Sequence, residues 1–188
     1  AYLAKAEEIY SDIATNAPDT TCCGPNPGGI WWDKAHTSKA TASNMGAVIV
    51  AARLTQRTGK DHLPFAKQVY DYWLKYMVDP ATNQVLDHIN DGDSAPTRWK
   101  FTYNEGLAIG ASLELYKSTK DAKYLENAHK FAAFMIKEET AEGEFGRVLT
   151  DGADPEKIEC HDGMMFKGIG FRYLALLQSV SPKPEYQA

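Results

Sequence analysis

The feature that most constrains the fold of this chain is an internal repeat of about 60 residues. One segment occurs three times, as YLAKAEEIYSDI from Tyr2, HLPFAKQVYDYWLKYM from His62 and YLENAHKFAAFMIKE from Tyr124. In the second copy, apolar residues such as Val69 and Trp73 share one helical face, which predicts an amphipathic outer helix. A repeat of this kind indicates one supersecondary unit that is used several times.

A second segment follows each copy and is richer in apolar and small residues: NMGAVIVAARL from Asn44, NEGLAIGASLEL from Asn104 and KGIGFRYLALL from Lys167. These segments predict buried inner helices, with Gly and Ala where a neighbouring backbone approaches closely. The sequence therefore predicts an all-α fold of three helical hairpins of about 60 residues each, in one domain over residues 1–188. Two arrangements stay open, an α/α toroid around a central cavity, which we favour, and an open α-solenoid.

Long links join each outer helix to the next inner helix, and they carry the unusual residues of the chain. The links read GGIWWDKAHTSKATASN, NQVLDHINDGDSAPTRWKFTYN and FGRVLTDGADPEKIECHDGMMFK. Each opens with a short apolar piece that we expect to be extended, and an acid follows it. Because successive side chains of an extended segment face opposite ways, we expect one of Trp31 and Trp32 to be buried and the other to face a cleft. Aromatic rings beside carboxylates and amides are suited to binding sugars.

Composition and charge exclude several classes of function. The 188 residues carry a net charge of -5 and no basic stripe, which argues against nucleic-acid binding. No apolar stretch approaches the roughly 20 residues of a membrane helix. The histidines show no metal-ligand spacing and the chain has no glycine-rich phosphate loop, so we expect no metal and no cofactor.

The three cysteines, Cys22, Cys23 and Cys160, do not form a zinc framework, which needs four ligands. A disulfide between Cys160 and Cys22 or Cys23 would close a loop of about 140 residues and stabilise the fold by roughly 4 to 5 kcal/mol in the chain-entropy model. Such a bond would place the protein outside the cytoplasm. The alternative is that the thiols are free and buried.

Several strings together resemble glycoside hydrolase family 76, the endo-α-1,6-mannanases of bacteria and fungi and their cell-wall transglycosidase relatives. The resemblance rests on GGIWWD, on SN at the start of an inner helix, on FTYNEGLAIGASLELYKSTKDAKYLENA and on CHDGMMFKGIGFRYLALL, in that order. It implies an (α/α)6 barrel, a secreted or cell-surface protein and an α-1,6-linked mannan substrate. It also implies retaining chemistry by two neighbouring aspartates.

The chain departs from the family pattern in two respects. The resemblance places the aspartate pair on an inner helix upstream of the first residues here, and this sequence contains no Asp-Asp dipeptide. The family barrel has six hairpins, so the three counted here are expected to form half of it, incomplete at both ends. No catalytic residue is assigned. The acids of the links that could replace the pair are Asp33, Asp87, Asp91, Asp93, Glu105 and Asp162.

The resemblance, together with the places where links meet inner helices, predicts a substrate-binding site at one opening. Its residues are Trp31, Trp32, Asp33, Asn44, Tyr103, Asn104, Asp162 and Lys167. Structural alternatives exist: the asparagines and Asp162 as helix caps, Tyr103 as core, and Lys167 as the partner of a nearby acid.

Two functions from different classes follow. The first is a glycoside hydrolase, or a part of one, that acts on α-1,6-mannan. The second is a non-catalytic mannan-binding or structural α-hairpin protein. The expected partner is an α-mannan oligosaccharide. Because half a toroid leaves helix flanks uncovered, we also expect self-association, or packing on missing segments of the same protein, along residues 2–13 or 166–180.

Overall fold

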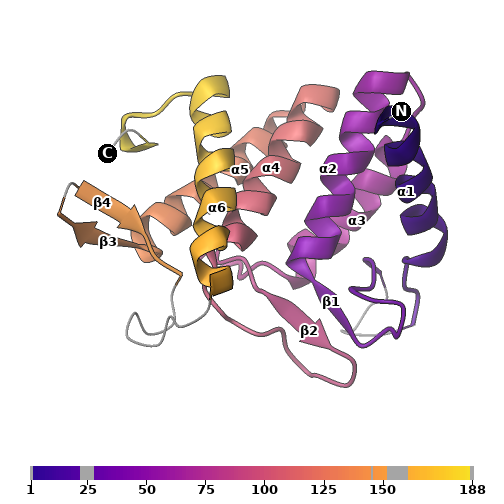
Figure 1. Ribbon diagram of the computed structural model, residues 1–188, viewed down its shortest axis with the longest axis horizontal. Helices are drawn as coiled ribbons and strands as arrows, with labels where there is room; N and C mark the ends of the chain where they lie inside the picture. The colour runs from indigo at the N-terminus through magenta and orange to yellow at the C-terminus, as the bar shows by residue number, and fades with distance from the viewer. Residues whose placement is uncertain (1, 22–27, 145, 152–160, 187–188) are drawn as a thin grey trace.

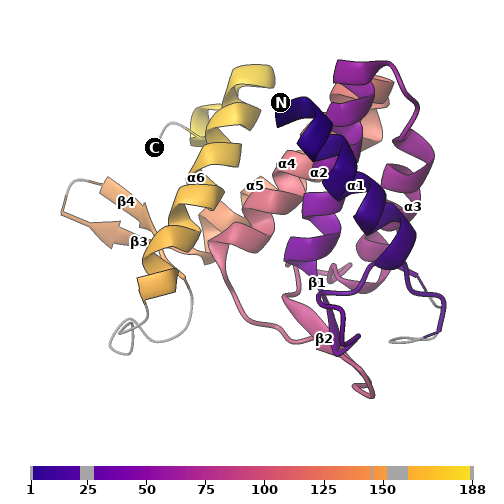
Figure 2. The same ribbon diagram turned by 45° about the vertical axis from the view of Figure 1, so that its right-hand side comes forward.

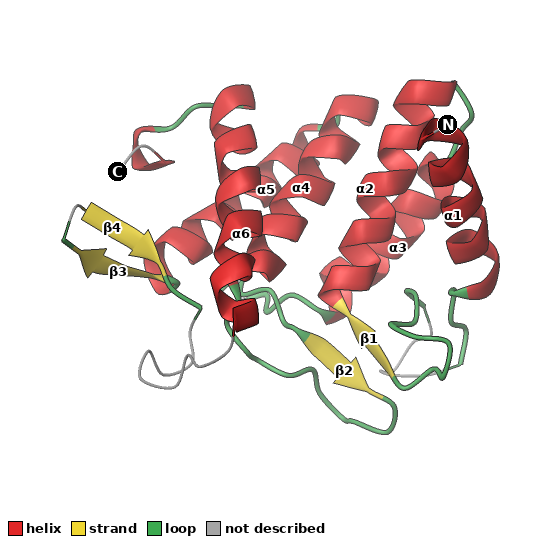
Figure 3. Cartoon of the chain, in the orientation of Figure 1, coloured by secondary structure: helices red, strands yellow, loops and turns green. Residues whose placement is uncertain are grey.

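The computed structural model describes residues 2–21, 28–144, 146–151 and 161–186, with only the backbone described for residues 161–164. Most of the described residues are helical, and short strands lie in the links (Figure 3). The helices are α1 (Tyr2–Asn16), α2 (Thr41–Thr58), α3 (Leu63–Tyr76), α4 (Thr102–Thr119), α5 (Ala122–Glu138), α6 (His161–Val180) and the short 3-10 helix η1 (Pro184–Tyr186). The strands are β1 (Ser38–Ala40), β2 (His88–Asn90), β3 (Thr140–Gly143) and β4 (Gly146–Leu149).

The helices form three hairpins, α1 with α2, α3 with α4 and α5 with α6, as the repeat predicts. The inner helices α2, α4 and α6 lie side by side, and α3 and α5 lie behind them in Figure 1. The outer helix α1 crosses beside α2, which Figure 2 shows most clearly. The predicted all-α fold of three hairpins, half of an α/α toroid, is therefore confirmed.

The inner helices approach closely where glycine removes a side chain. A Cβ on Gly106 of α4 would lie 2.8 Å from the Cα of Gly170 on α6, and one on Gly110 would overlap the ring of Tyr173. Gly46 of α2 occupies the repeat position of Gly106, but a Cβ there would meet no atom within 4 Å. α4 is thus covered on both flanks by inner helices, whereas α2 has one open flank.

Each link begins with a chain reversal after its outer helix. Pro18 pairs with Ile30 after α1, Val78 pairs with Val85 after α3, and β3 pairs antiparallel with β4 after α5. The expected extended piece at the start of each link is therefore confirmed. In addition, β1 of the first link pairs antiparallel with β2 of the second, with Ser38 opposite Asn90. The first two links lie at the N-terminal ends of α2 and α4, along the lower edge of Figure 1, and the β3–β4 hairpin of the third link lies at its left.

Within the described ranges, no helix is both long and apolar enough to cross a membrane. Cys22, Cys23 and Cys160 lie outside the described residues, as does the side chain of Asp162. The disulfide therefore stays a prediction.

Candidate functional site

The first link turns its two tryptophans to different environments. The backbone N–H of Trp31 donates to the Ala17 carbonyl (2.9 Å), and that of Trp32 donates to the Ser38 carbonyl (2.8 Å). The side chain of Trp31 is 8% exposed and stacks on His36, whereas Trp32 is 57% exposed. The expectation of one buried and one exposed tryptophan is confirmed.

Trp31, Trp32 and Asp33 line a cavity of about 630 Å³ between the first link, α1 and α2. Asp33 accepts hydrogen bonds from the Thr37 hydroxyl (2.7 Å) and the Thr37 N–H (3.1 Å). These bonds hold the pKa of Asp33 below its usual range, so its carboxylate is ionised in the cavity that Trp32 also lines. The other polar side chains that line the cavity include those of Asp12, Asn16, Lys34 and His36.

A buried ion pair supports this link. Lys39 is fully buried, pairs with Asp19 and donates to the Gly28 carbonyl (2.7 Å). Its ammonium lies 5.2 Å from the ring centre of Trp31 and 4.9 Å from that of Tyr72. Burial lowers the pKa of Lys39, and Asp19 opposes that shift. No sequence signal marks the pair, because a lysine in a short polar link is normally solvent-exposed.

Asn44, in the first turn of α2, is buried and forms hydrogen bonds with the backbone of the same link. Its Oδ1 accepts the Ile30 N–H (3.0 Å), and its Nδ2 donates to the carbonyls of Ile30 (3.1 Å) and Ala40 (2.9 Å). The side chain is 1% exposed, and the N-cap of α2 is Ala40. Asn44 therefore acts neither as a cap nor at the cavity surface. It positions the segment that carries the tryptophans.

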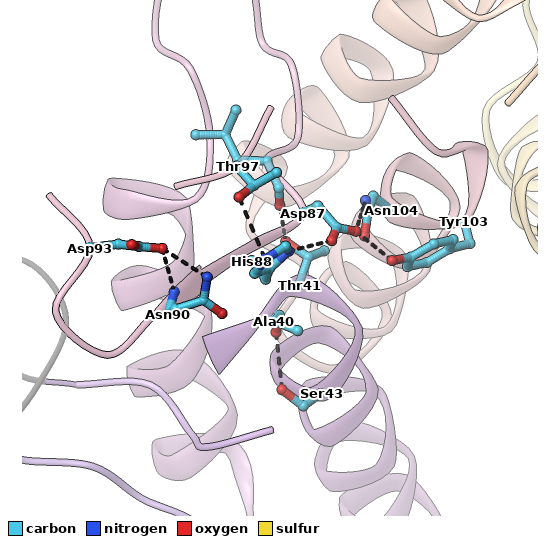
Figure 4. A network of polar contacts seen from close by, with 11 residues as sticks. Ala40, Thr41, Ser43, Asp87, His88, Asn90, Asp93, Thr97, Tyr103 and Asn104 are labelled. Atoms are coloured by element: carbon cyan, nitrogen blue, oxygen red, sulfur yellow. Dashed lines mark hydrogen bonds and ion pairs between the residues drawn. The ribbon is translucent and has the colours of Figure 1, made fainter. Parts of the chain in front are cut away.

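Asp87 holds the second link against the start of α4 (Figure 4). It accepts hydrogen bonds from the Tyr103 hydroxyl and from Asn104 Nδ2, the latter at 2.8 Å. His88 Nδ1 lies 2.7 Å from Asp87 Oδ2. Burial, reinforced by Asp87, raises the pKa of Tyr103, so its hydroxyl remains a donor. Asn104 has the repeat position of Asn44, and it too holds the link that precedes its helix.

A threonine at the start of each of these two helices binds the following link. The Thr41 hydroxyl donates to the Leu86 carbonyl (2.6 Å), and its N–H donates to the Asp87 carbonyl (2.8 Å). The N–H and the hydroxyl of Thr102 both donate to Asp151 Oδ1 at 2.7 Å. Each of these inner helices thus joins two successive links, one through its asparagine and one through its threonine. Neither residue's partner could be identified from the sequence.

Two carboxyl groups are buried together near the start of α4. Glu105 and Glu139 are both fully buried, and Glu105 Oε1 accepts the Val85 N–H (3.1 Å). Glu105 and Glu139 contact each other through a side-chain hydrogen bond, which requires one of the two carboxyl groups to carry a proton. Burial, followed by the charge of Glu139, raises the pKa of Glu105, and burial raises the pKa of Glu139 to about 7. The pair therefore holds a proton at mildly acidic pH.

The predicted site residues do not all meet at one cavity. Lys167 lines a second cavity of about 560 Å³, between α6, the β3–β4 hairpin and η1. Tyr103 and Asn104 belong to the network around Asp87. In the part of the chain that the structure describes, no three or more His, Cys, Asp or Glu side chains are arranged to hold a metal ion.

The fold and the site define the class of protein. Three α-hairpins place their inner helices side by side, and a cavity lined by tryptophan and aspartate lies at the end where the first two links lie. This is the architecture of half an (α/α)6 barrel. The model of Glycosyl hydrolase family 76 matches residues 1–187, and the chain belongs to this family.

Relatives of the chain share the fold and extend beyond it. The Lin0763 protein from Listeria innocua is 31% identical, with a TM-score of 0.87 over 99% of this chain and 51% of its own. The α-1,6-mannanase of Salegentibacter sp. HEL1_6 is 30% identical, with a TM-score of 0.80 over 99% of this chain and 54% of its own. A mannan endo-1,6-alpha-mannosidase of Candida glabrata is 31% identical over 69% of this chain and 30% of its own. The chain thus spans about half the length of these solved relatives.

Proposed function

We propose that this chain forms part of the α-1,6-mannan-binding cleft of a glycoside hydrolase. The observation that carries the proposal is the exposed ring of Trp32 beside the fixed carboxylate of Asp33, on the wall of the 630 Å³ cavity. A pyranose ring can stack on the indole while its hydroxyls donate to the carboxylate. The names of the mannanase and mannosidase relatives support α-1,6-mannan as the substrate class.

The proposed site residues fall into two roles. Trp32 and Asp33 contact the sugar, because they line the cavity, and buried Trp31 supports that wall from behind. Buried Asn44 and Asn104, together with Tyr103, position the links through the hydrogen bonds described above. Lys167 and Asp162 are proposed as substrate contacts from the third hairpin, outside this cavity.

We further propose that the 188-residue chain binds mannan without cleaving it. The sequence contains no two consecutive aspartates. In the Salegentibacter mannanase, an inactive variant with two consecutive aspartates replaced was solved with α-1,6-mannotriose. A retaining glycosidase needs two carboxyl groups about 5 Å apart on either side of the scissile bond. Release of reducing ends from α-1,6-mannan by the purified chain would contradict this proposal.

Calorimetric titration with α-1,6-mannobiose tests the binding site. Trp32→Ala is expected to weaken binding by about 1 kcal/mol or more, the usual scale for losing a stacking partner. Tyr2→Ala is the matched control, because Tyr2 is an exposed aromatic residue that lines neither of the two cavities. Equal affinities of wild type and Trp32→Ala would exclude the first cavity as the sugar site.

We also propose a secreted or cell-surface protein, in line with a mannan substrate. The oxidation state of Cys160, read by thiol alkylation of protein from its source, tests that location. Self-association along residues 2–13 or 166–180 stays a prediction, supported by the exposure of Tyr2, Ile9 and Phe171. A sedimentation experiment that finds only monomers would contradict it.

A further inference from the structure

The second link carries an exposed tryptophan, Trp99, that the cavity does not include. Its neighbours in sequence point toward the ends of outer helices: Arg98 pairs with Asp79 after α3, and Lys100 pairs with Glu138 at the end of α5 (3.3 Å). Trp99 instead contacts His88 of β2, with ring centres 5.3 Å apart. This alternation is that of an extended segment. Trp99 therefore points away from the outer helices and toward β2. We call the end of the fold that carries the first two links the link end.

Trp99 begins a continuous aromatic strip, which we define as Trp99, Phe101, Tyr103 and Phe166. The ring centres of Trp99 and Phe101 are 5.8 Å apart, and those of Tyr103 and Phe166 are 4.6 Å apart. Phe101 contacts both Tyr103 and Phe166, so the strip runs from the second link across the starts of α4 and α6. Asp87 fixes Tyr103 within it.

The Trp99 ring contacts two other rings at steep angles, and more than half of the residue is exposed. His88 and Phe101 meet it at interplanar angles of 62° and 69°, and no described ring stacks on it. The side chain is 55% exposed. An indole that is held by ring contacts, yet largely exposed, loses little side-chain entropy when a flat apolar surface stacks on it.

Polar groups beside the ring have capacity for hydroxyl partners. His88 Nε2 and the Thr97 hydroxyl are 3.5 Å apart, at the limit of a hydrogen bond, in the network shown in Figure 4. The Thr97 hydroxyl can donate to or accept from a further hydroxyl group, and His88 Nε2 can accept from one while Nδ1 donates to Asp87. A ligand with an apolar ring face and several hydroxyls, such as a pyranose, satisfies both the indole and these groups.

Both exposed tryptophans of the described chain lie in links, one near the start of the first link and the other near the end of the second. Trp32 lies in the first link and Trp99 in the second, whereas Trp31 and Trp73 are buried. The two links are joined by the β1–β2 ladder and by the Asp91 N–H, which donates to the Thr37 carbonyl (2.9 Å). We propose that Trp99 is a second pyranose-stacking platform, so that the link end binds several consecutive units of a mannan chain rather than one or two.

This inference rests on the proposed function, and binding as a function of ligand length tests it. We would titrate the wild-type chain with α-1,6-linked mannooligosaccharides from the disaccharide to the hexasaccharide. Affinity is expected to rise with length, and Trp99→Ala should lower it about fivefold for the longest ligands while leaving the disaccharide unchanged. Trp99→Phe should keep most of the affinity. Trp32→Ala should weaken every length.

The outcomes separate the two proposals. If Trp32→Ala weakens binding but Trp99→Ala binds every length as the wild type does, the second platform is wrong and the first site stands. Wild-type chain that binds no oligosaccharide overturns both. Should Trp99→Ala fail to fold, the indole N–H of Trp99 in the wild-type NMR spectrum replaces it as the readout. That signal must shift with the hexasaccharide and not with the disaccharide, and any other pattern overturns the platform.

Discussion

The starts of α2 and α4 have equivalent positions in the repeat, but they hold their links with different chemistry. Asn44 clamps the backbone of Ile30 through neutral hydrogen bonds. Asn104 donates to the side chain of Asp87, and the next residue, Glu105, belongs to a buried carboxyl pair. Because carboxyl groups titrate and amides do not, the contacts of Asn44 do not depend on pH, whereas the buried carboxyl pair at the start of α4 does.

The same two helices also differ in how their flanks are covered. Gly106 meets the backbone of α6, whereas Gly46, two residues after Asn44, faces open space. The links therefore attach at equivalent positions of the two helices, but the elements that pack against the flanks of the two helices differ. Three experiments test these differences, beginning with the largest expected effect.

Removing the side chain that anchors the second link should destabilise the fold most. Asp87→Ala leaves the Tyr103 hydroxyl, the Asn104 amide and His88 without their acceptor, so the free energy of unfolding should fall by about 3 kcal/mol or more. Asn44→Ala removes only neutral bonds and should cost about 2 kcal/mol. Urea denaturation measures both.

Asp93→Ala is the control for this comparison. Asp93 is an exposed acid of the same link that accepts from Asn90, and its loss should change stability by less than about 1 kcal/mol. If Asp87→Ala were no more harmful than Asp93→Ala, the network would not anchor the link.

The paired glycines should respond to alanine with opposite signs. In Gly106→Ala the new Cβ would lie 2.8 Å from the Gly170 Cα and from the Ile169 carbonyl oxygen, so the helices must separate, at a cost of about 1 to 3 kcal/mol. Gly46→Ala meets no neighbour and should stabilise the chain by up to about 1 kcal/mol, through helix propensity. Thermal unfolding of the two variants would show this, and a loss in both would mean that the flank of α2 is covered in solution.

The third test concerns the pH dependence of the second hairpin. The pKa of Glu139 is raised from 4.5 in the unfolded chain to about 7 in the fold. A raised pKa contributes stability that is fully present below pH 4.5 and is lost as the pH rises through 7. Between pH 5 and 7, Glu139 should therefore lower the free energy of unfolding by up to about 1.4 kcal/mol per pH unit.

Glu139→Gln tests this dependence, because it removes the titrating group. Its stability should fall less steeply than that of the wild type between pH 5 and 7. Glu138→Gln is the matched control: hydrogen bonds to Lys137 and Lys100 lower the pKa of Glu138, so its contribution is lost only at more acidic pH. A parallel pH profile for wild type and Glu139→Gln would contradict the proton-sharing pair.

Much of the fold could be predicted because its signals are local. The spacing of apolar residues predicts the helices, the repeat predicts their pairing, and the alternation of an extended segment predicts that Trp31 and Trp32 differ in exposure. The roles of the site residues could not be predicted in the same way. Asn44 and Asn104 mark the inner-helix starts, but their partners, Ile30 and Asp87, depend on how the links fold back.

The buried charged groups were missed for the same reason. Lys39 meets Asp19 only after the first link has folded back on itself, and Glu105 meets Glu139 only after α4 and α5 have packed. Nothing in the neighbourhood of a single lysine or glutamate in the sequence indicates that partner. Such contacts can be identified only from the tertiary structure, whereas the periodicity of apolar residues can be identified from the sequence alone.

The β1–β2 ladder has a kinetic consequence. It joins Ser38 to Asn90 across a long stretch of chain, whereas the turns between successive helices, such as that from α2 to α3, are short. Closing the longer loop costs more conformational entropy, and this cost comes before the stabilising contacts form. The link end should therefore become ordered after the helices. Amides of β1 and β2 should then exchange with deuterium through partial opening, faster than those of α4. A mannan chain that spans both links would slow this exchange, because it would bind only the closed arrangement.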